Sequence, residues 1–430
     1  MVFEEQSELR KILAGTKLPK FAMVRQIFPE DEITDVAAYL KEKLSDPVFA
    51  CRIKPGMKVV MTGSSREIAN MPVILRELSR FVKMQGAQPY IIPAMGSHGG
   101  ATDEGQRELL ESYGITEAFC ECPIHSSMET VRVGFVGEDE VRMDKFAHEA
   151  DAIILVGRIK GHTAFAGTYE SGMAKMMAIG LGKREGADSL HKYGFGKMAE
   201  RIPLFAKVVF DHCNIIFGVA SIENERDRTC RIEVIRSEEI FDKEPELLMY
   251  AKSRMPRLIL PETDVLVIRE IGKNISGSGL DSNVTGTFAT PFKTGGIKKQ
   301  RVVILDITEE SHGNYLGLGN ADITCLRAFN KIRTNGCYAN MLTSTVLKVG
   351  NIPMIMEDDE LALRAAVKLM TSGDRSDPRM IYLKNTLSLD TILVSEAHLE
   401  EVKKHPDMEI LEEPRYLNFD EKGNLLDFAN

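Results

Sequence analysis

The sequence predicts an α/β protein of two domains, each built on a mostly parallel sheet. At 430 residues, the chain exceeds what one hydrophobic core usually serves. Apolar residues make up 43% and charged residues 27%, a balance typical of globular proteins. Apolar runs of strand length alternate with amphipathic stretches of helix length. This alternation predicts parallel strands with helices on both faces of the sheet.

The first strand–helix–strand unit is the clearest. Residues 58–62 (KVVMT) are typical of a buried strand, and a polar turn from Gly63 to Arg66 follows. Met71–Met84 is amphipathic and predicts a helix, and Gln88–Pro93 predicts the next strand. Later strands are expected at Ala152–Val156, Ile215–Ala220, Val265–Ile268, Val302–Leu305 and Thr391–Val394. Ligands of such sheets bind in the loops beyond the carboxyl ends of the strands.

The domain boundary is expected where two prolines separate a charged helical run from a new strand, in MPRLILPE at residues 255–262. We therefore expect domains of residues 1–258 and 259–430. The stretch from Arg415 to Phe428 has an Asp-Glu-Lys-Gly turn between short apolar groups. It predicts a hairpin that packs on either domain, including a return to the N-terminal one.

Charge and composition exclude several classes of partner. The net charge is -9 and no long basic run occurs, which argues against nucleic acid or an anionic membrane. No apolar stretch approaches the roughly 20 residues that span a bilayer. The first residues are acidic and mixed, unlike a signal peptide. Seven scattered cysteines are typical of free thiols in a reducing compartment, so a cytoplasmic location is predicted.

Three of the nine histidines lie in or beside glycine-rich segments. His98 lies in AMGSHGGAT (94–102) and His162 in GRIKGHTAFAG (157–167), each directly after a strand, and His191 follows SGMAKMMAIGLG (171–182). Glycines let the backbone approach a ligand closely. The three histidines and Lys175 together indicate a functional site. His312, in ESHGN (310–314), is a further candidate for substrate contact, whereas His398 lies among charged residues and is expected to be solvated.

Conventional metal and phosphate motifs are missing. The sequence has no His-Glu-x-x-His and no paired Cys-x-x-Cys, so a metal held by these histidines would need ligands from another source. The segment GLGKREG (180–186) is superficially similar to a nucleotide-binding turn. It follows a helical stretch rather than a strand, which disfavours that interpretation.

These residues resemble the nickel-dependent lactate racemase family. The similarity comprises Gly-Ser-His98-Gly, Gly-His162, Ser171-Gly172-Met-Ala-Lys175 and His191, in that order and with the same interval from Lys175 to His191. The resemblance is thinner in the second half, where Glu270-Ile-Gly-Lys273 stands in place of the family's Gln-x-x-Lys.

The resemblance implies an N-terminal cofactor-binding catalytic domain and an active site in the cleft between the two domains. It implies a nickel-pincer nucleotide, a pyridinium ring with two sulfur arms, bound covalently to Lys175. His191 would be the protein ligand of nickel. Arg66, Ser171 and Gly172 would bind the cofactor, and His98 and His162 would exchange the hydroxyl proton. Lys273, Glu270 and His312 would bind the substrate.

The implied activity is isomerisation of a small hydroxy acid by reversible hydride transfer. The sequence reads Gly63-Ser-Ser-Arg66 where lactate-acting members have Asp-x-x-Arg, and it has no tryptophan. These departures disfavour lactate itself as the substrate. Loops rich in small hydrogen-bonding residues, at 274–279, 282–286 and 340–345, favour an aldonate epimerase slightly over a 2-hydroxy acid racemase. A nicotinamide-dependent hydroxy acid dehydrogenase and a non-catalytic cofactor-binding protein are the alternatives. The expected partners are the substrate and cofactor-biosynthesis proteins, and homo-oligomerisation is left open.

Overall fold

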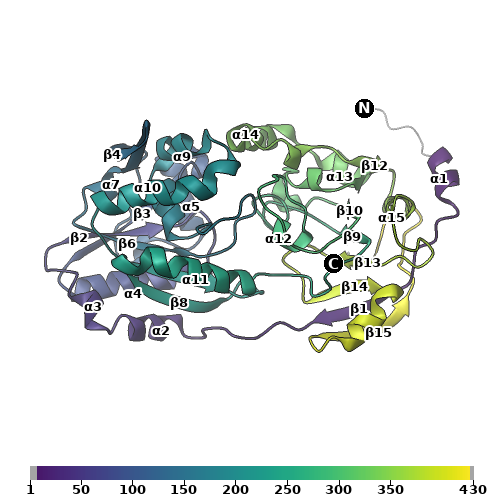
Figure 1. Ribbon diagram of the computed structural model, residues 1–430, viewed down its shortest axis with the longest axis horizontal. Helices are drawn as coiled ribbons and strands as arrows, with labels where there is room; N and C mark the ends of the chain where they lie inside the picture. The colour runs from purple at the N-terminus through teal and green to yellow at the C-terminus, as the bar shows by residue number, and fades with distance from the viewer. Residues whose placement is uncertain (1–6, 427–430) are drawn as a thin grey trace. The chain divides into compact units, whose positions relative to one another are not determined.

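The computed structural model describes residues 7–426 (Figure 1). The chain divides into two compact units. Glu30–Met255 form one, called the middle unit here, and Met1–Pro29 together with Pro256–Asn430 form the other, the terminal unit. The division falls three residues before the expected boundary at 258. The expectation that the chain's first 29 residues belong with the N-terminal domain is wrong, because strand β1 pairs within the terminal unit.

The middle unit contains a five-stranded sheet in the order β3-β2-β6-β7-β8. The first four strands are parallel, and β8 pairs antiparallel with β7. Its strands are β2 Lys58–Gly63, β3 Gln88–Pro93, β6 Ala152–Arg158, β7 Ile215–Glu223 and β8 Thr229–Arg236, with a separate hairpin of β4 Thr130–Val136 and β5 Asp139–Asp144. Its helices are α2 Val36–Lys43, α3 Pro47–Ala50, α4 Met71–Met84, α5 Asp103–Ser112, α6 Glu117–Cys120, α7 Lys145–His148, α8 Met173–Lys175, α9 Lys183–His191, α10 Met198–His212 and α11 Ile240–Ser253.

Two hydrophobic layers enclose this sheet. Alternate residues of one strand enter opposite layers, so that Val60 packs with α10 and α11 while Val59 packs with α4. Helix α4 suits its place because one face presents Ile74, Leu75 and Leu78, all fully buried. The predicted bounds of α4 and β3 are confirmed.

The terminal unit contains an eight-stranded sheet in the order β12-β11-β10-β9-β13-β14-β1-β15. The strands from β12 to β13 are parallel, and β14, β1 and β15 add antiparallel neighbours. The strands are β1 Phe21–Gln26, β9 Val265–Ile268, β10 Arg301–Ile304, β11 Ile323–Cys325, β12 Met354–Met356, β13 Met380–Leu383, β14 Thr391–Ser395 and β15 Met408–Arg415. The helices are α1 Ser7–Leu13, α12 Ser282–Thr285, α13 Leu326–Lys331, α14 Thr334–Ser344, α15 Asp359–Lys368 and α16 Leu399–Lys404.

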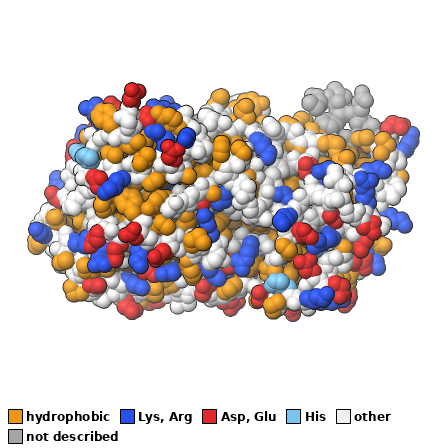
Figure 2. Space-filling view, in the orientation of Figure 1, with side chains coloured by type: hydrophobic (Ala, Val, Ile, Leu, Met, Phe, Trp, Pro, Cys, Tyr) orange, Lys and Arg blue, Asp and Glu red, His pale blue; other side chains and the backbone are white. Residues whose placement is uncertain are grey.

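The predicted fold class, mixed α/β with mostly parallel sheets, is confirmed. Among residues 7–426, no helix combines the length and the apolar character needed to cross a membrane. Figure 2 shows positively and negatively charged side chains intermixed over the visible face.

Candidate active site

Three predicted residues follow neighbouring strands of the middle unit. Arg66 follows β2, His98 follows β3 and His162 follows β6, and β2 pairs with both of the other two strands. Parallel strands end at the same edge of a sheet, so these loops share the edge where α/β proteins bind ligands.

Lys175 lies where α8 passes into a π-helical turn. The turn, η2, covers Met176–Gly180, and the N–H of Leu181 donates to the carbonyl of Met176 at 2.8 Å. Such turns are rare and frequently occur at functional sites. They interrupt regular helix, and here the interruption begins directly after the predicted cofactor lysine.

The carboxylate of Glu244 holds the turn that precedes Lys175. Glu244 is buried and accepts a hydrogen bond from the N–H of Ala174 at 2.9 Å. A Cβ atom at Gly172 would lie 2.2 Å from Glu244 Oε1, so any larger residue there would displace this carboxylate. Ser171 contributes its backbone, which exchanges hydrogen bonds of 3.0 and 3.2 Å with Lys160. In this structure Ser171 and Gly172 therefore shape the turn that carries Lys175.

Replacement of Glu244 by glutamine is expected to flatten the pH dependence of stability. Burial raises the pKa of Glu244 from 4.5 to about 7, so the folded state binds this proton more tightly than the unfolded state. Stability should therefore fall as the pH rises from about 4.5 to about 7, by roughly 3 kcal/mol at 1.36 kcal/mol per pKa unit. Urea unfolding at pH 5 and pH 7.5 measures this slope.

The matched control is Glu246→Gln, an exposed position on the same helix. The control should keep the slope of the unaltered protein. An unchanged slope in the Glu244→Gln variant would contradict the assignment.

Lys175 lies in a region of excess positive charge. Its pKa is lowered to about 8, by burial first and by the positive charge of Arg66 second, against the opposing effect of Glu170. The side chain of Arg66 is exposed, yet partial removal of water by the surrounding protein lowers its pKa. Tyr113 opposes this effect, and the positive charge of Arg158 adds to it. Within residues 7–426, no carboxylate forms an ion pair with Arg66. Two neighbouring cations, neither of which forms an ion pair with a carboxylate that the structure shows, suit a phosphate or carboxylate ligand.

Glu170 is a residue of this region that the sequence analysis missed. Its side chain is fully buried and accepts hydrogen bonds from the backbone N–H groups of His162 at 2.6 Å and Gly167 at 3.2 Å. Lys252 forms an ion pair with it at 2.6 Å. Glu170 thereby fixes the loop of His162. Its position eight residues after His162 in a glycine-rich loop offered no signal distinguishing it from a surface carboxylate.

His191 and His162 both lie beside the aromatic ring of Phe195. Each imidazole centroid is 6.1 Å from the ring centroid of Phe195, and the His162 ring also packs, tilted, against Phe165 at a centroid distance of 4.4 Å. The pKa of His191 is lowered, by burial first and by Lys175 second, so its imidazole is neutral at pH 7. A neutral imidazole is the form that binds a metal ion.

The loop of His98 is held by a second group of buried residues that the sequence analysis missed. The side-chain amide of Gln106 donates to the carbonyls of Gly96 at 2.8 Å and His98 at 3.2 Å. Lys183 donates to Gln106 Oε1 at 3.1 Å and forms an ion pair with Asp144 at 3.0 Å. The side chains of Gln106, Lys183 and Asp144 are buried.

The same group excludes a phosphate-binding role for the 180–186 segment. Lys183 is buried and forms its ion pair with Asp144, so it is not available to bind a phosphate. A Cβ atom at Gly180 would lie 2.6 Å from the carbonyl oxygen of Ala94. The N–H of Gly96 donates to the carbonyl of Gly180 at 3.1 Å. The glycine therefore permits close contact between the His98 loop and the Lys175 segment.

The other three predicted residues lie in the terminal unit, after β9 and β10. The N–H of Lys273 donates to Ser311 Oγ at 2.8 Å, which joins its loop to the loop of His312. Its ammonium group donates to the carbonyl of Gly277 at 2.6 Å. Glu270 accepts a hydrogen bond of 2.8 Å from the side chain of buried Asn385, a partner that follows β13 and that the sequence analysis missed.

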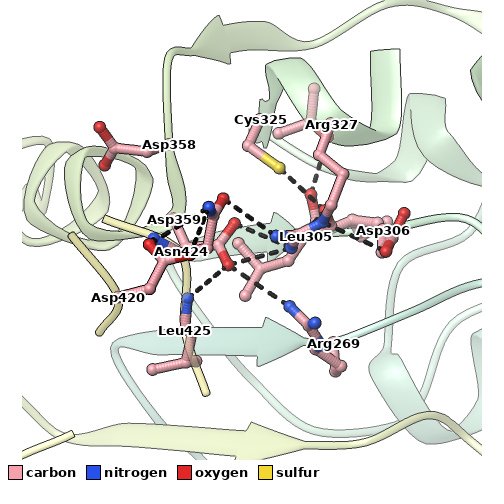
Figure 3. Close-up of polar contacts among 12 residues, drawn as sticks. Arg269, Leu305, Asp306, Cys325, Arg327, Asp358, Asp359, Asp420, Asn424 and Leu425 are labelled. Atoms are coloured by element: carbon pink, nitrogen blue, oxygen red, sulfur yellow. Dashed lines mark hydrogen bonds and ion pairs between the residues drawn. The ribbon is translucent and has the colours of Figure 1, made fainter. Parts of the chain in front are cut away.

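A charged network beside these loops fastens the C-terminal segment (Figure 3). Asp359 is fully buried and forms ion pairs with Arg327 at 3.0 Å and Arg269 at 3.3 Å. The N–H of Leu425 donates to the same carboxylate at 2.8 Å, and Arg327 donates to Asn424 at 3.2 Å. Of the two packings that the sequence leaves open for this segment, these contacts show packing on the terminal unit as far as residue 426. The end of the predicted hairpin lies outside the described residues.

Comparisons with known proteins agree with this fold. Residues 17–202 match the family described as the lactate racemase N-terminal domain. A crystal structure of a protein from Thermotoga maritima has a TM-score of 0.52 at 14% identity and covers 84% of this chain and 98% of its own. The lactate racemase apoprotein from Thermoanaerobacterium thermosaccharolyticum has a TM-score of 0.51 at 16% identity and covers 86% of this chain and 99% of its own. No curated protein matches the sequence.

The segment matched by the family contains all of the site residues predicted in the middle unit: Arg66, His98, His162, Ser171, Gly172, Lys175 and His191. The two solved structures share the arrangement of the chain over more than four-fifths of its length. The family match indicates an enzyme of the racemase or isomerase type. Residues 17–202 therefore match the N-terminal domain of the lactate racemase family, and the chain has a fold similar to that of a lactate racemase apoprotein.

Proposed function

We propose that this protein inverts a hydroxyl-bearing carbon of a small hydroxy acid, using a nickel-pincer nucleotide attached to Lys175. The observation that supports this most directly is the setting of Lys175. It is a lysine with a pKa of about 8, next to Arg66 and close enough to His191 to lower that residue's pKa. A lysine that loses its proton readily is suited to forming a covalent amide-type bond.

The residues present fit such a cofactor. Within the described chain, no three His, Cys, Asp or Glu side chains gather into a site that could hold a metal. A single neutral histidine, His191, would therefore need further ligands from a non-protein group, as a pincer with sulfur and carbon donors provides. The cation Arg66 suits the phosphate or carboxylate group that such a nucleotide or its substrate carries.

The chain's own residues would bind the substrate and move its hydroxyl proton. When bound, the cofactor supplies an acceptor for the hydrogen that leaves carbon as hydride. The hydroxyl proton must leave at the same time, and an imidazole with a pKa near neutrality is suited to accept it. We assign this task to His98 and His162. Lys273, Glu270 and His312 remain predicted substrate contacts.

The substrate proposal is a sugar acid of the aldonate type, ahead of a simple 2-hydroxy acid. It rests on loops of the terminal unit rich in small hydrogen-bonding side chains, at residues 274–279 and 282–286. Incubation of the cofactor-loaded enzyme with a panel of chiral hydroxy acids and aldonates, followed by NMR, should show loss of configuration at one carbon. Little deuterium should enter that carbon from heavy water. Complete exchange would contradict hydride transfer, and no inversion of any acid would contradict the function.

Replacement of His191 by alanine should remove the protein ligand of nickel and leave the covalent bond between Lys175 and the cofactor intact. Nickel content should fall by more than tenfold, since the imidazole is its only protein ligand in this proposal. The mass of the Lys175 peptide should still show the covalent adduct. The control is His212→Ala, an exposed histidine whose Nδ1 bonds to the carbonyl of Val208 and which should keep its nickel. Full nickel retention in the His191 variant would contradict the assignment.

A further inference from the structure

We propose that His98 and His162 are held in opposite tautomers, so that only His98 accepts a proton at Nε2 in the resting enzyme. His162 then acts as a hydrogen-bond donor from Nε2. This inference rests on the proposed function for its catalytic meaning. The tautomers themselves follow from two hydrogen bonds to the backbone.

The first bond joins His98 to its own loop. Nδ1 of His98 lies 2.8 Å from the carbonyl oxygen of Met95. A carbonyl oxygen only accepts hydrogen bonds, so Nδ1 must carry a hydrogen. Because this bond persists in both the neutral and the protonated ring, Nε2 is the nitrogen that gains and loses the proton.

In the second bond the ring nitrogen is the acceptor instead of the donor. The backbone N–H of Ala164 donates to Nδ1 of His162 at 3.1 Å. An N–H only donates, so Nδ1 is unprotonated and the neutral ring carries its hydrogen on Nε2. A second proton could enter this ring only at Nδ1, and it would displace the Ala164 bond.

The surroundings of His162 oppose a change of tautomer by ring rotation. Rotation by half a turn would place a ring carbon where Nδ1 now accepts from Ala164. The ring packs against Phe165 in a tilted arrangement, with centroids 4.4 Å apart and planes 35° apart. The backbone N–H of His162 is tied at 2.6 Å to Glu170, which is fully buried.

The two bonds give the histidines different tasks. When the hydroxyl O–H bond breaks, its proton passes to His98 Nε2. The O–H electron pair completes the carbonyl double bond as the carbon-bound hydrogen departs with its own pair to the hydride acceptor of the proposed function. His162 Nε2–H can donate a hydrogen bond to the same oxygen, but it cannot take its proton while Ala164 occupies Nδ1. His98 can therefore accept the hydroxyl proton from one configuration of the substrate directly. For the other configuration, His162 can accept the proton only after its hydrogen bond with Ala164 breaks.

The direct test is NMR of the full chain without cofactor, with the ring nitrogens labelled by ¹⁵N. Spectra of His98→Gln and His162→Gln assign the signals. His98 should show a protonated Nδ1 and an unprotonated Nε2, and His162 the reverse. The same tautomer in both rings, or a protonated Nδ1 in His162, would overturn the proposal. This result does not depend on activity, so it can fail or hold separately from the proposed function.

Removal of the Ala164 donor provides a second test. Ala164→Pro lacks the N–H, and His162 should then populate the Nδ1–H tautomer to a measurable extent while His98 stays unchanged. The matched control is Ala166→Pro in the same loop, for which both rings should keep their tautomers. An unaltered His162 in Ala164→Pro would overturn the role of this bond.

In the cofactor-loaded enzyme, replacement of His98 should lower kcat more than replacement of His162. His98→Gln removes the base and should lower kcat by about 10²–10⁴-fold. His162→Gln keeps an amide donor and should lower kcat by about tenfold, whereas His162→Leu should lose more. Equal losses in the two glutamine variants would overturn the division of tasks.

Discussion

Replacement of Lys175 by methionine is expected to abolish activity and, at neutral pH, to make the protein more stable. The activity should be lost because methionine has no amine with which to bind the cofactor. The stability should rise because the folded state depresses the pKa of Lys175 from 10.5 to about 8, which means that folding disfavours its charged form. That cost is fully present below about pH 8 and disappears as the pH rises to about 10.5.

The expected gain is about 1–3 kcal/mol at pH 7, the upper value being the full shift at 1.36 kcal/mol per unit and the lower allowing for partial solvent contact. Urea unfolding at pH 7 and pH 10 measures it, and the gain should shrink at the higher pH. Mass spectrometry of the Lys175 peptide shows whether the adduct is present. A lysine that served only the fold would give the opposite pattern, a loss of stability with activity retained.

The control for this experiment is Lys197→Met. Lys197 is an exposed lysine that pairs with Glu200 at 2.7 Å on the surface. Its replacement should change stability by no more than about 0.5 kcal/mol and should leave activity intact. A comparable gain in this control would assign the effect to a general loss of surface charge.

Much of the fold could be predicted because its elements have strong local signals. The helix Met71–Met84 and the strand Gln88–Pro93 are found at their predicted bounds, since hydrophobic periodicity and flanking turns determine both. The loops of His98 and His162 were found because each follows such a strand. The antiparallel strands β8 and β15 were not predicted, because only scattered residues in them are buried and they lack the continuous apolar runs of parallel strands.

Long-range pairing explains the remaining differences. Strand β1 joins β14 and β15, nearly 400 residues away in the sequence, and nothing in its local pattern indicates this partner. His398 is fully buried, against expectation, because the charged residues beside it in the sequence lie on another face. It shares a hydrogen bond of 3.2 Å with Thr263, and burial lowers its pKa to about 3, with a further contribution from Arg379.

Some residues of the candidate site could be predicted from local sequence, and others could not because they act through contacts distant in the sequence. Glycines around His162 and Lys175 are the local signal on which the prediction of these two site residues rests. Glu170, Glu244 and Gln106 could not be found this way, because each holds a loop from a distance through buried hydrogen bonds. Only the folded arrangement distinguishes these carboxylates and this amide from the many that lie on the surface.

Replacement of Lys183 by methionine is expected to destabilise the protein by about 3–5 kcal/mol, because it leaves a fully buried Asp144 without its cation. The lysine also donates to the carbonyl of Pro93 at 2.5 Å and to Gln106, and these acceptors would lose their partner. Urea unfolding at pH 7 measures the loss. Since Gln106 holds the His98 loop, kcat should fall as well, even under conditions where the variant remains folded.

The double variant Lys183→Met with Asp144→Leu identifies the cause. Removing both charges should recover part of the loss, leaving a cost of about 1–2 kcal/mol because Asp144 also accepts a hydrogen bond from Ala147 at the start of α7. Arg184→Met, at the neighbouring exposed position, should change stability by no more than about 0.5 kcal/mol. The contrary result is that the stability losses of the two single variants simply add in the double variant. That result would show that the charges of Lys183 and Asp144 do not interact, and that Gln106 alone holds the His98 loop.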